Sequence, residues 1–308
     1  MSDCDLCSAV FVLRPQRMFS AEHRFLGRMA QRLFLLTLNH AGYEALAVKL
    51  HGLNAALPYT VSDLFMNGSQ YTWMRVTGLN AELCQALKQL VDQLPGQILE
   101  VPPRDSADEA VWTVRVEAAV MSQHEWAGSA TYSSFVQQAW MKPRNNCLTL
   151  DFMTPTAIKS VGVYRPFPQP TLVFRRLYER WLKLDAAPLP FQPEVVYLEA
   201  FTNYLIEIAD YEIACASTPQ KRGQTTTFYG WINYQLLSGN DDFRKRAETQ
   251  ETKNGDTSLL LMYEDVLKHR EQYAALIHFL AAFAFYSGLG SYTAQGLGMV
   301  RKVEHNGR

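Results

Sequence analysis

The residues best suited to chemistry lie near the C-terminus, in a segment that is rich in glycine and is followed by two cations, Arg301 and Lys302. Its members that could contact a ligand through backbone or hydroxyl groups are Gly288, Gly290, Ser291, Thr293, Gly296 and Gly298. Glycine permits positive φ and a close approach to the backbone. Together with hydroxyl groups and positive charge, this composition indicates a phosphate-binding segment.

Two common nucleotide-binding loops do not fit this segment. A Walker loop needs a Lys-Ser/Thr pair that opens a helix, and a dinucleotide fingerprint follows an early strand and has an acidic residue about twenty positions later. Here the segment follows an apolar helix predicted near residues 278–286 and leads into a predicted strand. A plain turn, or an enzyme site for a small phosphorylated ligand, remains an alternative.

Composition limits the possible partners. With 308 residues the chain can form two domains, and its formal net charge of -1 gives no global basic field. Any nucleic-acid site is therefore expected to be local. No apolar run reaches the roughly 20 residues that a membrane helix needs, so no membrane contact is expected.

The cysteines favour a reducing compartment. Five are scattered over the chain with no secretory segment ahead of them, at positions Cys4, Cys7, Cys84, Cys147 and Cys215. Cys4 and Cys7 have the spacing of half a metal site, but no second pair follows. We therefore expect a cytoplasmic protein without a metal at this motif.

Periodicity predicts an α+β arrangement in the first half. The expected elements are a strand over 10–13, a helix over 24–38, strands over 59–66 and 71–78, a helix over 80–94 capped by Asn80, and a last strand over 97–101 or 112–120. This order is that of a ferredoxin-like unit, which is also the architecture of the RNA-recognition motif.

The second half repeats this order. The expected elements are a strand over 147–153, a helix over 170–183, strands over 195–206, 211–216 and 225–234, a helix over 271–286 and a strand over 299–303. Residues 240–258, rich in charge, are expected to form an exposed loop. The predicted domains are 1–143 and 144–308.

Four segments, in this order, resemble the CRISPR-associated RAMP endoribonucleases of the Cas six family. They are Leu50-His51-Gly52 with the strand at 57–65, the strand and proline-spaced linker at 152–170, the glycine-centred strand at 228–234, and the glycine-rich segment. Their joint order carries the resemblance, which spans most of the chain. It implies two tandem ferredoxin-like domains with RNA crossing the face between them.

The resemblance implies cleavage of the repeat in precursor CRISPR RNA, without a metal or organic cofactor. The ribose 2′-OH would attack the phosphate and leave a 5′-hydroxyl and a 2′,3′-cyclic phosphate. This chemistry needs a proton acceptor, a proton donor and positive charge near the phosphate. The implied partners are repeat RNA and the mature guide RNA, with subunits of an interference complex as further candidates.

His51 is the first candidate for proton transfer, because it occupies the position of the family's Leu-His element and histidine titrates near neutrality. Its alternative role is to stabilise the C-terminal end of a helix. His40, at the end of the first predicted helix, is the second candidate. The two histidines could also share acid and base duties.

Two positions depart from the family pattern. Leu36 and Leu57 stand where the resemblance implies a tyrosine and a lysine, and leucine can do neither job. Three explanations remain open. Nearby side chains could substitute, His51 could act with only the glycine-rich segment, or the chain could bind repeat RNA without cleaving it, as a subunit of an interference complex. The candidate substitutes are Arg28, Arg32, Tyr43 and Lys49.

Local cationic clusters are the candidate RNA contacts. They are Lys142 with Arg144, Arg175 with Arg176 and Arg180, Lys221 with Arg222, and Arg301 with Lys302. Phosphate contacts of this kind make binding weaken steeply with salt. The alternative for each cluster is a solvated charged surface.

Overall fold

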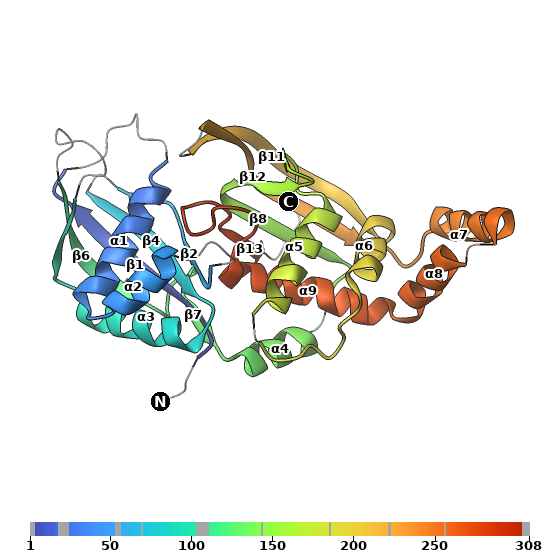
Figure 1. Cartoon of the computed structure of the whole chain (residues 1–308), viewed down its shortest axis with the longest axis horizontal. Helices are drawn as coiled ribbons and strands as arrows, with labels where there is room; N and C mark the ends of the chain where they lie inside the picture. Colours follow the sequence, from blue (N-terminus) through green and yellow to red (C-terminus); the bar gives the residue numbers. More distant parts are fainter. Residues whose placement is uncertain are drawn as a thin grey trace.

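The computed structural model describes residues 4–17, 25–52, 57–68, 70–102, 111–142, 144–184, 186–220, 223–255 and 257–303. The chain has a mixed α+β fold in which each half contains one main antiparallel sheet. The sheet of the first half lies at the left of Figure 1 and that of the second half at the right, with the glycine-rich segment, residues 288–298, between them.

The sheet of the first half has the order β2-β4-β1-β6-β5. Its strands are β1 (Leu6–Pro15), β2 (Tyr59–Val61), β3 (Phe65–Asn67), β4 (Tyr71–Gly78), β5 (Ile98–Val101), β6 (Trp112–Val120) and β7 (Gly128–Ala130). The short strands β3 and β7 pair with β4 and β1. The central strand β1 is buried along most of its length, because it has core on both faces.

Three helices accompany this sheet: α1 (Gly27–His40), α2 (Glu44–Gly52) and α3 (Ala81–Gln93). Phe34 of α1 and Leu87 of α3 are fully buried in one apolar core with Phe11 of β1. Both α1 and α3 are amphipathic, and each lays its apolar stripe on the sheet. Asn80 caps α3 as predicted, because its side chain accepts the Leu83 N–H at 2.9 Å.

The second half has the sheet order β11-β12-β8-β13. Its elements are α4 (Tyr132–Met141), β8 (Cys147–Thr156), β9 (Ile158–Ser160), β10 (Val163–Arg165), α5 (Pro170–Leu182), α6 (Val195–Tyr204), β11 (Ile206–Gln220), β12 (Gly223–Leu236), α7 (Asp241–Asn254), α8 (Ser258–Lys268), α9 (Arg270–Ser287) and β13 (Val300–Val303). Helix α9 is buried along most of its length, and α7 and α8 project at the right-hand end of Figure 1.

The prediction of a strand over 195–206 is wrong, because this segment forms α6 up to Tyr204. Its β-branched and aromatic residues favour a strand locally. Leu198, Phe201 and Thr202 are nevertheless buried together at helical spacing, and Phe201 packs against Tyr273 of α9 with ring centroids 5.0 Å apart. Tertiary packing therefore overrides the local preference.

The prediction of an exposed loop over 240–258 is also wrong, because Asp241–Asn254 is helix α7. Asn240 caps it by accepting the Phe243 N–H at 2.9 Å, and Gly255 ends it in the left-handed region at φ 65. Only Phe243 and Ala247, one turn apart, are fully buried. Two apolar residues in a charged segment give only a weak sequence signal for a helix.

The two halves meet at the C-terminal end of α9. Arg75 of β4 is 2% exposed and donates from Nε to the Ser8 hydroxyl at 2.7 Å and from Nη2 to the Phe285 carbonyl. Its guanidinium lies 4.3 Å from the centroid of the Phe285 ring. Thr77 donates to the Tyr286 carbonyl at 2.8 Å. Burial lowers the pKa of Arg75 to about 9.

Asp63 fixes the start of α1. Its Oδ1 accepts the N–H of Leu26, just before the helix, at 2.7 Å and the N–H of Leu64 at 2.9 Å. Burial raises the pKa of Asp63 to about 6, although these hydrogen bonds oppose the rise. The two backbone hydrogen bonds therefore hold the carboxylate in place, and it forms no ion pair among the described residues.

Asp63→Asn should remove a pH dependence of stability. The folded-state pKa of Asp63 is above its usual value, so this carboxyl favours folding below about pH 4, and that contribution is lost as the pH rises through about 6. Asparagine keeps the acceptor oxygen without the charge. Relative to the variant, the wild type should lose about 2 to 3 kcal/mol of unfolding free energy between about pH 4.5 and about pH 7.5.

Urea unfolding of both proteins across this pH range measures the difference. Asp63→Ala is the control, because loss of the acceptor leaves two N–H groups unpaired and should destabilise the chain by about 1 to 3 kcal/mol relative to Asp63→Asn at every pH. A difference between wild type and Asp63→Asn that stays constant with pH would contradict the assignment.

Candidate nucleic-acid interface

The glycine-rich segment is hydrogen-bonded to the first half of the chain. The Val61 N–H donates to the Thr293 carbonyl at 3.0 Å, and the Gly296 N–H donates to the Val61 carbonyl at 2.9 Å. Ser62 and Gly296 form a parallel bridge next to this pair. The segment thus extends the edge of the first sheet beyond β2.

The same segment is also hydrogen-bonded to the second half. The Ser291 N–H donates to the Ala157 carbonyl at 2.8 Å, and the Gly298 N–H donates to the Pro155 carbonyl at 3.0 Å. A third bond, from the Leu289 N–H to the Gly298 carbonyl at 2.9 Å, closes the segment on itself. Its backbone is therefore fixed from both sides.

The glycines are needed for these close backbone contacts. A Cβ on Gly296, whose φ is +91, would lie 2.5 Å from the Cα of Gly27, and a Cβ on Gly290, whose φ is +89, would lie 2.4 Å from the Ala157 carbonyl oxygen. Gly288 lies against the backbone of Gly298, and Gly298 lies against the backbone of Leu289. Packing within the protein therefore explains all four glycines, and only part of the segment is open to a ligand.

The accessible part of the segment lies around Ser291 and Tyr292. Thr293 is buried, Ser291 is half-buried, and Tyr292 is 38% exposed with its hydroxyl 3.3 Å from that of Tyr164. Tyr292 also adopts φ 62, which is unusual for a residue with a side chain. The sequence gives no sign of this conformation, because tyrosine is not a residue type that favours positive φ.

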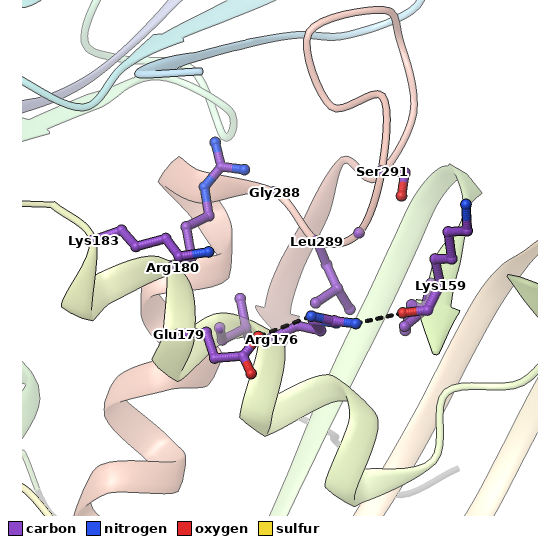
Figure 2. Close-up of a pocket in the computed structure, with 11 residues that line it drawn as sticks. Lys159, Arg176, Glu179, Arg180, Lys183, Gly288, Leu289 and Ser291 are labelled. Carbon is purple, nitrogen blue, oxygen red and sulfur yellow. Dashed lines mark hydrogen bonds and ion pairs between the residues drawn. The ribbon is translucent and has the colours of Figure 1, made fainter. Parts of the chain in front are cut away.

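A cavity of about 270 Å³ lies between this segment and α5 (Figure 2). We call it the α5 cavity. Its charged lining consists of Lys159, Arg176, Glu179, Arg180 and Lys183. Glu179 accepts from Arg175 at 2.7 Å and from Arg176 at 2.9 Å. Among the residues that the structure describes, the other lining cations form no ion pair.

Arg180 joins three parts of the chain. From α5, its Nη2 donates to the Leu57 carbonyl at 3.1 Å and its Nη1 lies 3.5 Å from the Thr293 hydroxyl. Burial of the guanidinium lowers the pKa of Arg180 to about 10. Its Nε is enclosed and has no hydrogen-bond partner within the described part of the chain.

The two candidate histidines are exposed on neighbouring helices. His40 ends α1, whose other end packs against Gly296, so α1 separates His40 from the glycine-rich segment by about 20 Å. His51 lies in the last turn of α2, six residues before Leu57. Leu57 contacts Arg180, which lines the α5 cavity.

The residues considered as substitutes for the missing tyrosine and lysine are bound elsewhere. Lys49 forms an ion pair with Glu82 at 2.8 Å, and the Tyr43 hydroxyl donates to Gln89 at 2.6 Å. Arg32 donates to the Pro102 carbonyl. Leu36 and Leu57 are partly buried against the core of the first half.

Several predicted RNA contacts are paired with carboxylates. Arg175 binds Glu179 and Glu199, at 2.7 Å and 2.5 Å, and Arg176 binds Glu179 and the Lys159 carbonyl. Arg301 binds Glu125 at 2.6 Å and Asp151 at 3.4 Å, and lies over the Trp126 ring at 4.4 Å. Their charge is largely compensated within the protein.

The remaining predicted cations lie near the junction of the halves or outside the described residues. Lys142 follows α4 and is exposed, and Arg144 donates to the Trp140 carbonyl. Lys221 and Arg222 lie outside the described residues. Within the described ranges, no three His, Cys, Asp or Glu side chains converge as metal ligands. No helix in those ranges is both long and apolar enough to span a bilayer.

Three solved structures illustrate the similarity of fold. Thermus thermophilus Cas6 has a TM-score of 0.68 at 20% identity, with 98% of this chain and 100% of that chain covered. A Cas6 product complex has a TM-score of 0.67 at 23% identity, with 97% and 99% covered. A Cas6 substrate mimic complex has a TM-score of 0.62 at 22% identity, with 97% and 99% covered. A search of curated proteins finds no match.

The family comparison concerns the second half. Residues 150–300 match the family model of the CRISPR-associated endoribonuclease Cas6. This range contains most of β8, the lining of the α5 cavity and the glycine-rich segment. With the same fold along nearly the whole chain, the match identifies this protein as a member of the Cas6 family of CRISPR-associated endoribonucleases.

Proposed function

We propose that the chain cleaves the repeat of precursor CRISPR RNA without a metal, by attack of a ribose 2′-OH that leaves a 5′-hydroxyl and a 2′,3′-cyclic phosphate. One observation carries the proposal: the glycine-rich segment is hydrogen-bonded to both halves and opens beside a cavity rich in cations. The similarity of the chain's fold to Cas6 structures described as product and substrate mimic complexes supports an RNA ligand.

We also propose that residues 1–143 and 144–308 are two ferredoxin-like domains. In the first half β1 lies between β4 and β6, and in the second half β8 lies between β12 and β13. In each half the first long strand is thus central and antiparallel to its neighbours, as this fold requires. The junction at α9 would then be the interface between the domains.

Within the proposed RNA site, residues differ in what they contribute. Gly290 and Ser291 face the α5 cavity and would contact phosphate directly, whereas Gly288, Thr293, Gly296 and Gly298 would shape the segment. Lys142, Arg144, Lys221 and Arg222 would add positive charge along the path of the RNA. Arg175, Arg176 and Arg301 would contribute less, because they share their charge with carboxylates.

We assign proton transfer to His51. Its side chain is exposed and therefore accessible to RNA, and Leu57, six residues later, contacts Arg180 of the α5 cavity lining. A neutral imidazole can take the 2′-OH proton, and an imidazolium can protonate the leaving 5′ oxygen. His40 is the second candidate, although α1 places it farther from the glycine-rich segment.

A non-catalytic crRNA-binding subunit of an interference complex is the second candidate function. Leu36 and Leu57 favour it, because both pack against apolar core where an acid or a cation would assist cleavage. This function keeps the RNA site and lacks only the proton transfer. RNA binding alone therefore does not separate the two functions.

His51→Ala should reduce cleavage of the neighbouring repeat RNA by about 10²- to 10⁴-fold in EDTA, the range usual for loss of a general acid or base. Labelled RNA and analysis of the product ends measure this and identify the cyclic phosphate. His269→Ala is the matched control, because His269 binds Asp265 at the start of α9.

Two outcomes would overturn parts of this assignment. Loss of cleavage in His40→Ala but not in His51→Ala would transfer the catalytic role to His40. Binding without cleavage by the wild type would leave the crRNA-binding subunit as the function.

Gly27→Ala should displace the glycine-rich segment and slow cleavage. The new Cβ would lie 2.1 Å from the Gln295 carbonyl oxygen, so the two backbones must separate. Overpacking of this kind destabilises by about 1 to 3 kcal/mol. Gly239→Ala is the control, because no atom lies within 4 Å of its added Cβ. Thermal unfolding and cleavage rates of both variants test this, and equal effects would contradict it.

A further inference from the structure

Arg180 presents an enclosed positive charge that the fold does not neutralise. Its Nε has no partner, its two contacts are to a carbonyl and a hydroxyl, and it forms no ion pair with any described residue. The carboxylate next to it in sequence, Glu179, is turned toward Arg175 and Arg176. Of its five guanidinium N–H groups, only two find an acceptor among the described residues, and the enclosed Nε is not one of them.

Such an arrangement is unfavourable unless an anion completes it. An enclosed charge without a counterion is unfavourable, and a planar guanidinium is suited to bind two oxygens of one phosphate. The Arg180 side chain lines the α5 cavity, whose volume of about 270 Å³ holds a small group. An anionic ligand would therefore supply hydrogen-bond acceptors for the Arg180 guanidinium that the protein does not supply.

The side chains around Arg180 also favour an anionic ligand. Lys183 lies one turn farther along α5, and Lys159 lies on β9 across Leu289, as Figure 2 shows. Both ammonium groups are on exposed side chains and neither forms an ion pair among the described residues. Ser291 adds a hydroxyl at the rim. The α5 cavity thus has several donors and no available acid.

We propose that the α5 cavity binds a backbone phosphate of the RNA, with Arg180 as its principal ligand and Lys183 and Lys159 beside it. The inference rests on the proposed function, because it takes repeat RNA as the ligand. Arg180 also contacts the carbonyl of Leu57 in the first half. The second half would therefore supply positive charge next to this part of the first half.

The test compares Arg180→Met with the wild type, using repeat RNA that carries a deoxyribose at the cleavage position so that binding is measured alone. Affinity should fall about ten- to hundredfold, the range for a charged hydrogen-bonded contact. The slope of log affinity against log salt should become less steep by about 0.7 to 0.9. Thermal stability should change little, because the half-buried Arg180 has no ion pair among the described residues to lose.

Arg244→Gln is the matched control. It removes one cation from the exposed pair with Glu248 on α7, far from the α5 cavity, and should alter neither affinity nor slope. If Arg180→Met does not fold, Lys183→Gln replaces it, because that side chain is exposed. It should weaken binding severalfold and reduce the slope, with no effect on stability.

The outcomes separate the inference from the proposed function. A wild type that does not bind repeat RNA would refute the function. Wild-type binding with equal affinity and slope in Arg180→Met would refute the inference alone. Inorganic phosphate provides a further arm: if it stabilises the wild type but not Arg180→Met while both bind RNA equally, the α5 cavity is a site for free phosphate and the inference fails.

Discussion

The enclosed guanidinium of Arg75 is the contact on which the relation between the two halves depends. It binds the Phe285 carbonyl at the end of α9, and Thr77 binds the carbonyl of the next residue. The last carbonyls of a helix have no partners within the helix and carry partial negative charge. The aromatic faces of Phe285 and Trp126 add a second compensation for the buried cation. The point where α9 ends, and the glycine-rich segment begins, is thereby set by the sheet of the other half.

Much of the fold can be predicted from the sequence, and the failures have a common cause. Strand β4 begins and ends where the alternation of residues 71–78 predicts, and α3 begins after its Asn80 cap. The two wrong elements, α6 and α7, are helices whose stability comes from contacts distant in the sequence. Phe201 packs on Tyr273, and Phe243 stacks on Tyr204 with centroids 3.9 Å apart. Local propensity cannot register such contacts.

The candidate site can be predicted less well from the sequence than the fold can. The glycine-rich segment is evident from its composition, but the structure shows that its glycines serve contacts between backbones. Arg175 and Arg301 look like free cations in the sequence, and carboxylates far along the chain, Glu199 and Asp151, pair with them. Arg176 and Arg180 lie one turn apart on α5 and differ in their partners, because Arg176 binds Glu179 and Arg180 donates to the Leu57 carbonyl. That difference is set by packing and has no sequence signal. The histidine assignments stay predictions.

The bridge between Ser62 and Gly296 has a consequence for how the protein acquires its structure. The residues that close the edge of the first sheet and cover the start of α1 are synthesised long after the strands of that sheet. Contacts between such distant positions form late, because closing the intervening loop is entropically unfavourable. During synthesis the first half can therefore build its core while the edge beyond β2 stays unpaired. The edge of the first sheet is then completed only after the second half has been synthesised.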